Sequence, residues 1–234
     1  MTDWMSWNEK WKKKNKSEIL KYIMNARNCN CKQISLYDGN FYDRFIAPNQ
    51  RELFAQIIKL IEPDSDIIDI GCGTGFFSFS IADKSKTVLG IDLSTRNITK
   101  ANRNLIKQPS DKLSFRNTYL HDILSEDKKH FDYAVMTYVI HEVNEEDRIQ
   151  LLNEMAQVAD KIIIGDYLIP CPNDFAGKIV KAVEFMAGEE HYMNFRTYEA
   201  NGGIQFLADK AGLSVLKEIK NHTNHIAVLS KNNV

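Results

Sequence analysis

Three glycines at alternate positions, Gly71, Gly73 and Gly75, separate two short apolar runs of the sequence. One acid, Asp69, precedes the first glycine by two residues, and another, Asp92, closes the second apolar run. Glycines in a turn after a buried strand let a ligand approach the backbone closely, because they carry no Cβ. The pattern therefore indicates a small-ligand site at a glycine-rich turn, and three classes of protein build such a site.

Two of these classes fit the spacing poorly. A P-loop needs a lysine followed by Ser or Thr directly after its last glycine, but Gly75 is followed by Phe76 and Phe77. A dinucleotide-binding turn of the G-x-G-x-x-G type has its third glycine one residue later than Gly75. The glycine spacing alone does not decide, and an NAD-dependent oxidoreductase stays an alternative.

The elements that must position these residues follow from the apolar pattern. Short apolar runs predict strands at 66–70, 87–92, 113–119, 131–139 and 161–169, with helical periodicity between them. A helix to about residue 187, an irregular aromatic-rich segment over 188–198, another helix and a β-hairpin complete the chain. Alternating strands and helices predict a doubly wound α/β sheet that binds ligands at the carboxyl ends of its strands.

The same segments resemble the class I S-adenosylmethionine-dependent methyltransferases over roughly residues 50 to 231. The matching pieces are "DIGCGTG", "VLGIDLS", "HDI", "FDYAVMTYVIHEV", "KIIIGDYL" and "LADKAGL", in that order along the chain. The resemblance implies a Rossmann-like seven-stranded sheet with an antiparallel last strand. It also implies S-adenosyl-L-methionine as cofactor and S-adenosyl-L-homocysteine as product, in a small-molecule enzyme similar to the quinone-biosynthesis group.

The resemblance also implies roles for single residues in holding the cofactor. Asp92 would accept hydrogen bonds from both ribose hydroxyls, a charge-assisted contact. Leu93 and Ile123 would sandwich the adenine, Asp122 would accept from its amino group, and Asp69 would fix the amino group of the methionine moiety. The full set implied for cofactor binding is Asp69, Gly71, Cys72, Gly73, Gly75, Asp92, Leu93, Asp122, Ile123, Thr137, Tyr138 and Tyr42.

The acceptor side is predicted less closely, because a sulfonium methyl group is already activated and the enzyme mainly aligns the nucleophile. His141 is the candidate catalytic residue, either as a general base or as a ring that only packs over the adenosine. Acceptor contacts are expected from an insert around 172–200 and from the N-terminal segment. The candidate substrate-binding residues are Tyr37, Arg44, His191, Tyr192 and Arg196.

Cysteines suggest neither a metal site nor a nucleophile. Cys29 and Cys31 lack a second half-site for a metal, so none is predicted. Cys171 lies between two prolines, as the nucleophile of a cytosine methyltransferase lies beside one, but companion motifs are missing. We therefore interpret Cys171 as an ordinary thiol of a reducing cytoplasm.

Composition and net charge limit the kinds of partner and the cellular location that the sequence favours. The 234 residues carry a net charge of −1 and 44% hydrophobic residues, which argues against nucleic-acid or membrane partners and for a cytoplasmic protein. Residues 1–50, with Trp4, Trp7 and Trp11 at helical spacing, are predicted to form a helical lid or a homodimer contact, and residues 51–234 the methyltransferase domain. The predicted function is methyl transfer to O, N or C of a small molecule; a non-catalytic cofactor-binding sensor or assembly protein is the alternative.

Overall fold

Apolar, β-branched runs form the strands of this protein, and the segments with helical periodicity form the helices between them. The computed structural model describes residues 47–126 and 130–232. In chain order the elements are α2 (Ala47–Leu60), β1 (Asp66–Ile70), α3 (Phe76–Ile81), β2 (Thr87–Ile91), α4 (Thr95–Lys107), β3 (Leu113–Arg116), α5 (Leu120–Ser125), β4 (Phe131–Thr137), α6 (Glu145–Val158), β5 (Ala159–Tyr167), α7 (Phe175–Ala187), α8 (Glu189–Ala200), α9 (Gly203–Lys210), β6 (Leu213–Lys220) and β7 (Asn224–Lys231).

The strands form one seven-stranded sheet in the order β3-β2-β1-β4-β5-β7-β6. The first five strands pair in parallel, and β7 runs antiparallel to both of its neighbours. This confirms the predicted doubly wound sheet with an antiparallel last strand. In the register, Ile70 pairs with Ile91 on one side and with Met136 on the other, so the segments that follow these residues leave the sheet side by side.

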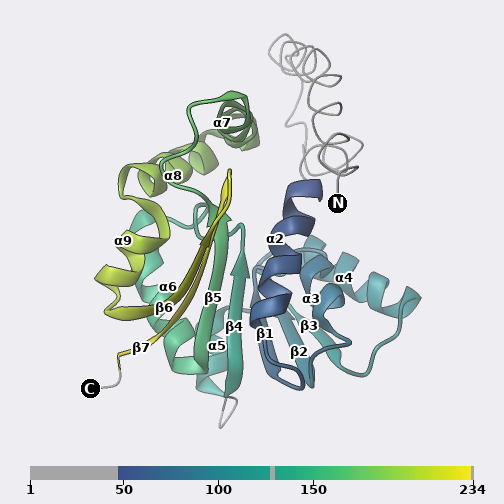
Figure 1. Cartoon of the computed structure of the whole chain (residues 1–234). Helices are drawn as coiled ribbons and strands as arrows, with labels where there is room; N and C mark the ends of the chain where they lie inside the picture. The colour runs from purple at the N-terminus through teal and green to yellow at the C-terminus, as the bar shows by residue number, and fades with distance from the viewer. Residues whose placement is uncertain (1–46, 127–129, 233–234) are drawn as a thin grey trace, which may run out of the picture. The chain divides into compact units, whose positions relative to one another are not determined.

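Helices cover both faces of the sheet, and each face has its own core (Figure 1). Alternate strand residues point to opposite faces, so Ile67 packs with α2, α3 and α4, whereas Ile68 packs with α5, α6 and α9. Helices α7 and α8 lie beyond the carboxyl end of β5 instead of covering a face (Figure 1). The part of the chain that the resemblance assigns to the acceptor therefore lies at the carboxyl edge of the parallel strands.

Several predicted boundaries need correction. The segment over 188–198, expected to be irregular, is helix α8: Glu189 and Glu190 favour its first turn, and Phe195 and Tyr198, three residues apart, bury one face. The predicted third and fourth strands end early, at Arg116 and Thr137. A short helix, α5, carries the "HDI" residues.

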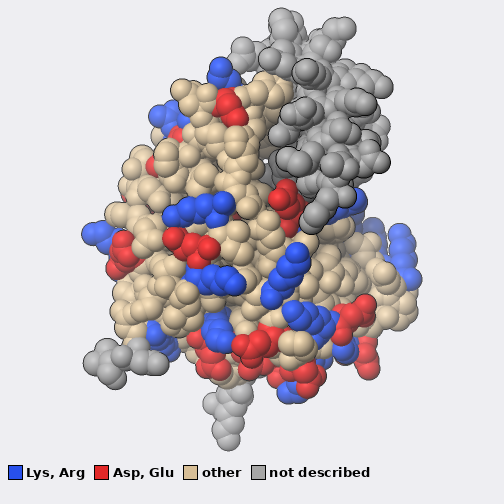
Figure 2. Space-filling model, in the orientation of Figure 1, with Lys and Arg blue, Asp and Glu red and all other residues tan. Residues whose placement is uncertain are grey.

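Some predictions cannot be compared with the structure. Tyr37, Tyr42 and Arg44, and the tryptophans of the N-terminal segment, lie outside the described residues. None of the helices in the described ranges combines the length and apolar character that a membrane crossing needs. On the face shown in Figure 2, Lys and Arg side chains alternate with Asp and Glu, so that view offers no broad basic surface.

Candidate active site

The glycine-rich turn after β1 depends on backbone conformations that other residues rarely adopt. Gly71 and Gly73 have φ of +70° and +56°. A Cβ on Gly71 would lie 2.5 Å from Cγ2 of Val139, so this glycine is required by packing. A Cβ on Gly73 would meet nothing within 4 Å, so Gly73 is the position where the turn leaves open space for a ligand.

Asp92 ties the end of β2 to this turn. Its Oδ2 accepts a hydrogen bond from the Gly73 N–H at 2.8 Å, and its Oδ1 accepts one from the Ser94 N–H at 2.7 Å. The side-chain amide nitrogen of Asn97 lies 3.4 Å from each oxygen. The carboxylate for which the resemblance implies a ribose contact thus lies directly beside the open side of Gly73.

Asp69 is a carboxyl group with an unused oxygen. It is 1% exposed and accepts a hydrogen bond from the Ser78 hydroxyl through Oδ2, while Oδ1 has no hydrogen-bond partner among the described residues. Burial raises the pKa of Asp69 to about 7, and the nearby Asp92 charge adds to the rise. A bound cationic donor would satisfy Oδ1 and favour the charged carboxylate.

The residues implied for the adenine differ in accessibility. Leu93 is 61% exposed, as expected of a side chain that awaits a ligand, but Ile123 is 0% exposed and belongs to the core under α5. The expected sandwich is corrected accordingly: a ring could stack on Leu93, but Ile123 is covered by its neighbours. Asp122 lies in the first turn of α5 and accepts hydrogen bonds from the Thr118 hydroxyl and the Tyr119 N–H, and these bonds lower its pKa.

Three further implied cofactor residues line the ends of β1 and β4. Cys72 is buried, and burial raises the pKa of its thiol, so it packs rather than reacts. Thr137 is half-buried and pairs with Gly165 at the last rung between β4 and β5. Tyr138 has φ of +53°, uncommon for a bulky residue, and its hydroxyl donates to the Asn224 side chain on β7 at 2.8 Å.

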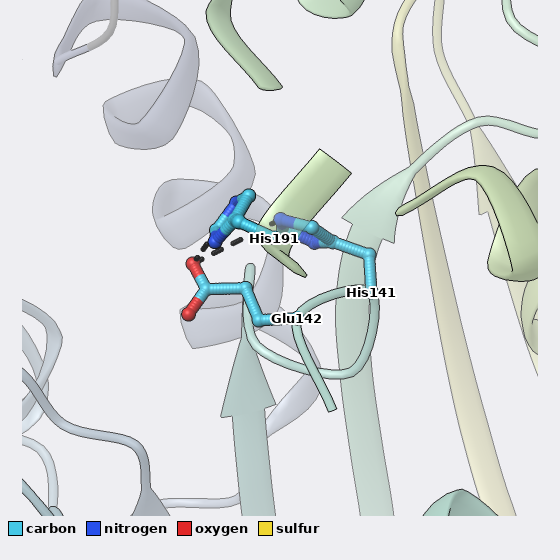
Figure 3. Close-up of side chains that lie close together, drawn as sticks. All are labelled: His141, Glu142 and His191. Carbon is cyan, nitrogen blue, oxygen red and sulfur yellow. Dashed lines mark ion pairs between the residues drawn. The ribbon is translucent and has the colours of Figure 1, made fainter. Parts of the chain in front are cut away.

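His141 lies in a group of ionisable side chains beyond the ends of β4 and β5. We call this group the histidine–carboxylate cluster; it consists of His141, Glu142, Asp166, Glu184 and His191 (Figure 3 draws three of the five). His141 is 1% exposed, and its Nδ1 lies 2.7 Å from Oδ1 of the buried Asp166. Glu184 Oε2 lies 2.6 Å from Nε2 of His191. The structure thus brings the predicted residues His141 and His191 together.

The cluster holds buried charge. Burial alone would lower the pKa of His141, but Asp166 and Glu184 outweigh it and hold the pKa well above its usual value. Burial alone would raise the pKa of Glu184, but the nearby rings of His141 and His191 outweigh it and lower the pKa to about 2. The two carboxylates therefore favour a positive charge at the His141 ring.

Sequence reasoning missed Asp166 and Glu184. Asp166 ends an apolar strand, and Glu184 shares a buried face of α7 with Val180 and Val183 at helical spacing. An acidic residue on an otherwise apolar face could have indicated a buried ion pair, because charged side chains are rarely buried without a partner.

The other predicted acceptor residues lie on the outer side of α8. Arg196 is exposed, and its guanidinium group lies over the half-buried Tyr192 ring at 5.9 Å. Phe195 and Tyr198 instead pack into the core, the structural role that the sequence left open for this segment. The structure does not bring Arg196 into the histidine–carboxylate cluster.

A buried arginine, also missed from the sequence, fastens α8 to the loop after β4. Arg148 is fully buried; its Nε donates to the Val143 carbonyl at 2.9 Å, and one terminal nitrogen donates to the Asn194 carbonyl and to the Thr197 hydroxyl. Val143 follows Glu142 directly, and Asn194 lies one helical turn after His191. Arg148 therefore fixes the two segments that carry the cluster.

Part of this chain is similar in sequence to known methyltransferases. Residues 67–161 match a family described as a methyltransferase domain. Over 118 residues the chain is 29% identical to an O-antigen chain terminator bifunctional methyltransferase/kinase of Escherichia coli, covering 48% of this chain and 17% of that protein. Over 94 residues it is 27% identical to a ubiquinone biosynthesis O-methyltransferase of Nitrosospira multiformis, covering 40% and 38%. The matches thus span well under half the length of these curated relatives.

Solved structures share the fold over most of the chain. A magnesium protoporphyrin IX methyltransferase from Synechocystis PCC 6803, crystallised with S-adenosylhomocysteine, superposes with a TM-score of 0.59 at 16% identity, covering 83% of this chain and 89% of that one. A methyltransferase from Aquifex aeolicus gives a TM-score of 0.56 at 16% identity, covering 78% and 92%. At such identities the likeness establishes the fold.

Proposed function

We propose that this chain, which carries a methyltransferase domain of the class I fold, transfers a methyl group from S-adenosylmethionine to a small-molecule acceptor. The observation that carries the proposal is the pairing of Asp92 with Gly73 at 2.8 Å, on the one glycine of the turn whose missing Cβ leaves open space. A ribose-binding acid and a ligand-accommodating turn are what this cofactor requires.

The described residues fit the cofactor in three ways. Asp92 offers carboxylate oxygens for ribose hydroxyls, and the exposed Leu93 side chain offers an apolar surface for the adenine ring. The buried, unpartnered Oδ1 of Asp69 suits the amino group of the methionine moiety. When bound, S-adenosylmethionine supplies a methyl group on a sulfonium, already activated for displacement.

The chain then has to hold the acceptor and exclude water. The histidine–carboxylate cluster lies at the ends of β4 and β5, next to the strand that carries the glycine-rich turn, and is the natural place for the acceptor. Asp166 fixes the His141 ring through Nδ1, so Nε2 is the atom left to act on an acceptor. For His141 to serve as a base, the proton that Asp166 and Glu184 hold on it must first leave.

An oxygen nucleophile on a small acceptor is the version that the relatives favour. One curated relative is named for O-methylation in ubiquinone biosynthesis. A net charge of −1 and the mixed charges seen in Figure 2 argue for a small acceptor over a polyanion. The acceptor would enter beside α8, where Tyr192 and Arg196 offer an aromatic ring and a cation.

The first test is isothermal titration with S-adenosylhomocysteine, with NAD as the comparison ligand. Micromolar binding of S-adenosylhomocysteine alone supports the proposal. The assay then measures S-adenosylhomocysteine released from S-adenosylmethionine with panels of phenols, amines and carboxylic acids. Binding of NAD alone would move the protein to the oxidoreductases, and binding of S-adenosylhomocysteine without turnover on any panel would favour a sensor or assembly protein.

A further inference from the structure

We propose that His141, Glu142 and His191 bind one divalent transition-metal ion. Glu184 lies beside the site as an additional carboxylate, and Asp166 holds the His141 ring. The sequence predicts no metal at this place, because His141 and His191 lie fifty residues apart and only the fold brings them together. Figure 3 shows both imidazole rings close to the Glu142 carboxylate.

The distances are those of a ligand set around a small cation. One donor atom from each of the three residues lies within 4.8 Å of the other two. Glu142 Oε1 is 3.9 Å from Nε2 of His141 and 3.8 Å from Nε2 of His191. Tetrahedral Zn²⁺ with bonds of about 2.0–2.1 Å places its donor atoms roughly 3.3 Å apart. The two Glu142 distances exceed this by about half an ångström, and the distance between the two histidine donor atoms exceeds it by at most about 1.5 Å, so rotations of the side chains can close the difference.

Nε2 of His141 is a buried nitrogen that has no adequate hydrogen-bond partner. It has no hydrogen-bond partner among the described residues, although the ring is almost fully buried. The nearest carboxylate oxygen, Oε2 of Glu184, is 3.5 Å away and is already engaged by His191 at 2.6 Å. A buried nitrogen left in this state is costly. A metal ion that displaces the Nε2 proton into solvent would bind the lone pair of Nε2 and supply the positive charge that the neighbouring carboxylates favour.

The other nitrogen of His141 has the support that metal-binding histidines normally receive. A ligating imidazole usually donates its second N–H to a carboxylate, which fixes the ring and makes the coordinating nitrogen more basic. Asp166 lies 2.7 Å from Nδ1 and is itself held by the Tyr167 N–H at 2.7 Å. His141 is thus oriented with Nε2 toward Glu142 and His191.

The donor set selects the kind of ion. Two imidazoles and one carboxylate suit Zn²⁺, Fe²⁺, Co²⁺ or Mn²⁺, whereas Mg²⁺ and Ca²⁺ prefer oxygen ligands. Three protein ligands leave a coordination position open, and the Glu142 side chain, 41% exposed, marks the accessible side. An ion there would polarise an oxygen of the acceptor and help it lose its proton. That consequence rests on the proposed function, but ion binding does not.

The test uses the full chain, stripped with a chelator and titrated separately with Zn²⁺, Co²⁺ and Mg²⁺ by calorimetry. We expect one tight site for Zn²⁺ and for Co²⁺, with visible ligand-field bands from cobalt, and much weaker heats with Mg²⁺. Glu142→Gln and His191→Asn should each weaken Zn²⁺ binding by at least about tenfold. Glu142 is on the surface, so its variant should fold normally.

His130→Asn is the matched control. His130 pairs with Asp160 at 2.8 Å in an exposed histidine–carboxylate contact before β4, at the opposite end of the strand. Its substitution should leave Zn²⁺ affinity unchanged. The proposal is overturned if the stripped chain binds neither Zn²⁺ nor Co²⁺, or if Glu142→Gln and His191→Asn bind as the parent chain does. Titration of each variant with S-adenosylhomocysteine reports separately on the cofactor site.

Discussion

Replacing Asp92 by Asn tests the proposed ribose contact, because it replaces one carboxylate oxygen by an NH₂ group. The substitution keeps the size of the side chain but leaves one acceptor oxygen and turns the other position into an NH₂ donor. In the structure both oxygens receive backbone N–H groups, from Gly73 at 2.8 Å and from Ser94 at 2.7 Å. An Asn side chain can accept only one of these bonds and must direct its NH₂ group at the other donor.

The size of the effect follows from those contacts. A hydrogen bond to a charged group contributes about 1.5–3 kcal/mol, so Asp92→Asn should lower the free energy of unfolding by roughly that amount. If ribose hydroxyls also donate to this carboxylate, the substitution should weaken the binding free energy of S-adenosylhomocysteine by a similar amount, in addition to the loss of folding stability. The dissociation constant of S-adenosylhomocysteine should then rise by about 10- to 150-fold.

Asp132→Asn is the control for this measurement. Asp132 also accepts a backbone N–H, from Asp66 at 2.7 Å, but it lies at the amino end of β4, away from the glycine-rich turn. Calorimetric titration of the three proteins with S-adenosylhomocysteine, with urea unfolding alongside, separates stability from affinity. If Asp92→Asn binds within about threefold of the parent chain, or if Asp132→Asn loses as much affinity, the ribose assignment is refuted.

Three further predictions concern single groups that are wholly or partly buried. Folding raises the pKa of Asp69 from 3.8 to about 7, so the stability that this group contributes is fully present below pH 3.8 and is lost as the pH rises to about 7. The free energy of unfolding of Asp69→Asn, measured in urea, should therefore rise relative to that of the parent chain by up to about 4 kcal/mol between pH 4 and pH 8. In the same experiment, Arg148→Met should lower the free energy of unfolding by about 3 kcal/mol. Substitution of an exposed arginine, Arg103→Met, should lower it by under about 0.5 kcal/mol. Burial raises the pKa of Cys171 to about 12, so iodoacetamide at pH 8 should label it at least about 100-fold more slowly than in the urea-unfolded chain, as read by mass spectrometry; equal rates would contradict a protonated thiol.

The sequence could predict that the glycine-rich turn and Asp92 lie together, because both belong to one strand–turn–helix unit and the strand beside it. Gly73 and Asp92 are nineteen residues apart, and the pairing of Ile70 with Ile91 brings them to hydrogen-bond distance. Ile123 shows where this local reading fails. The sequence cannot tell that α5 turns this side chain into the core, because its burial depends on packing against residues of other elements.

The acceptor half depends on contacts between elements that no local pattern records. His141 and His191 come from the loop after β4 and from α8, and the buried Arg148 holds these two segments together through their carbonyl groups. Neither histidine has a metal-ligand neighbour at a familiar spacing, and Asp166 and Glu184 read as ordinary residues of a strand and a helix. The three buried ionisable groups of this cluster, His141, Asp166 and Glu184, carry a desolvation cost that apolar side chains in their place would not. The proposed cation would offset that cost, so this cluster, rather than the glycine-rich turn, should decide which acceptor the chain takes.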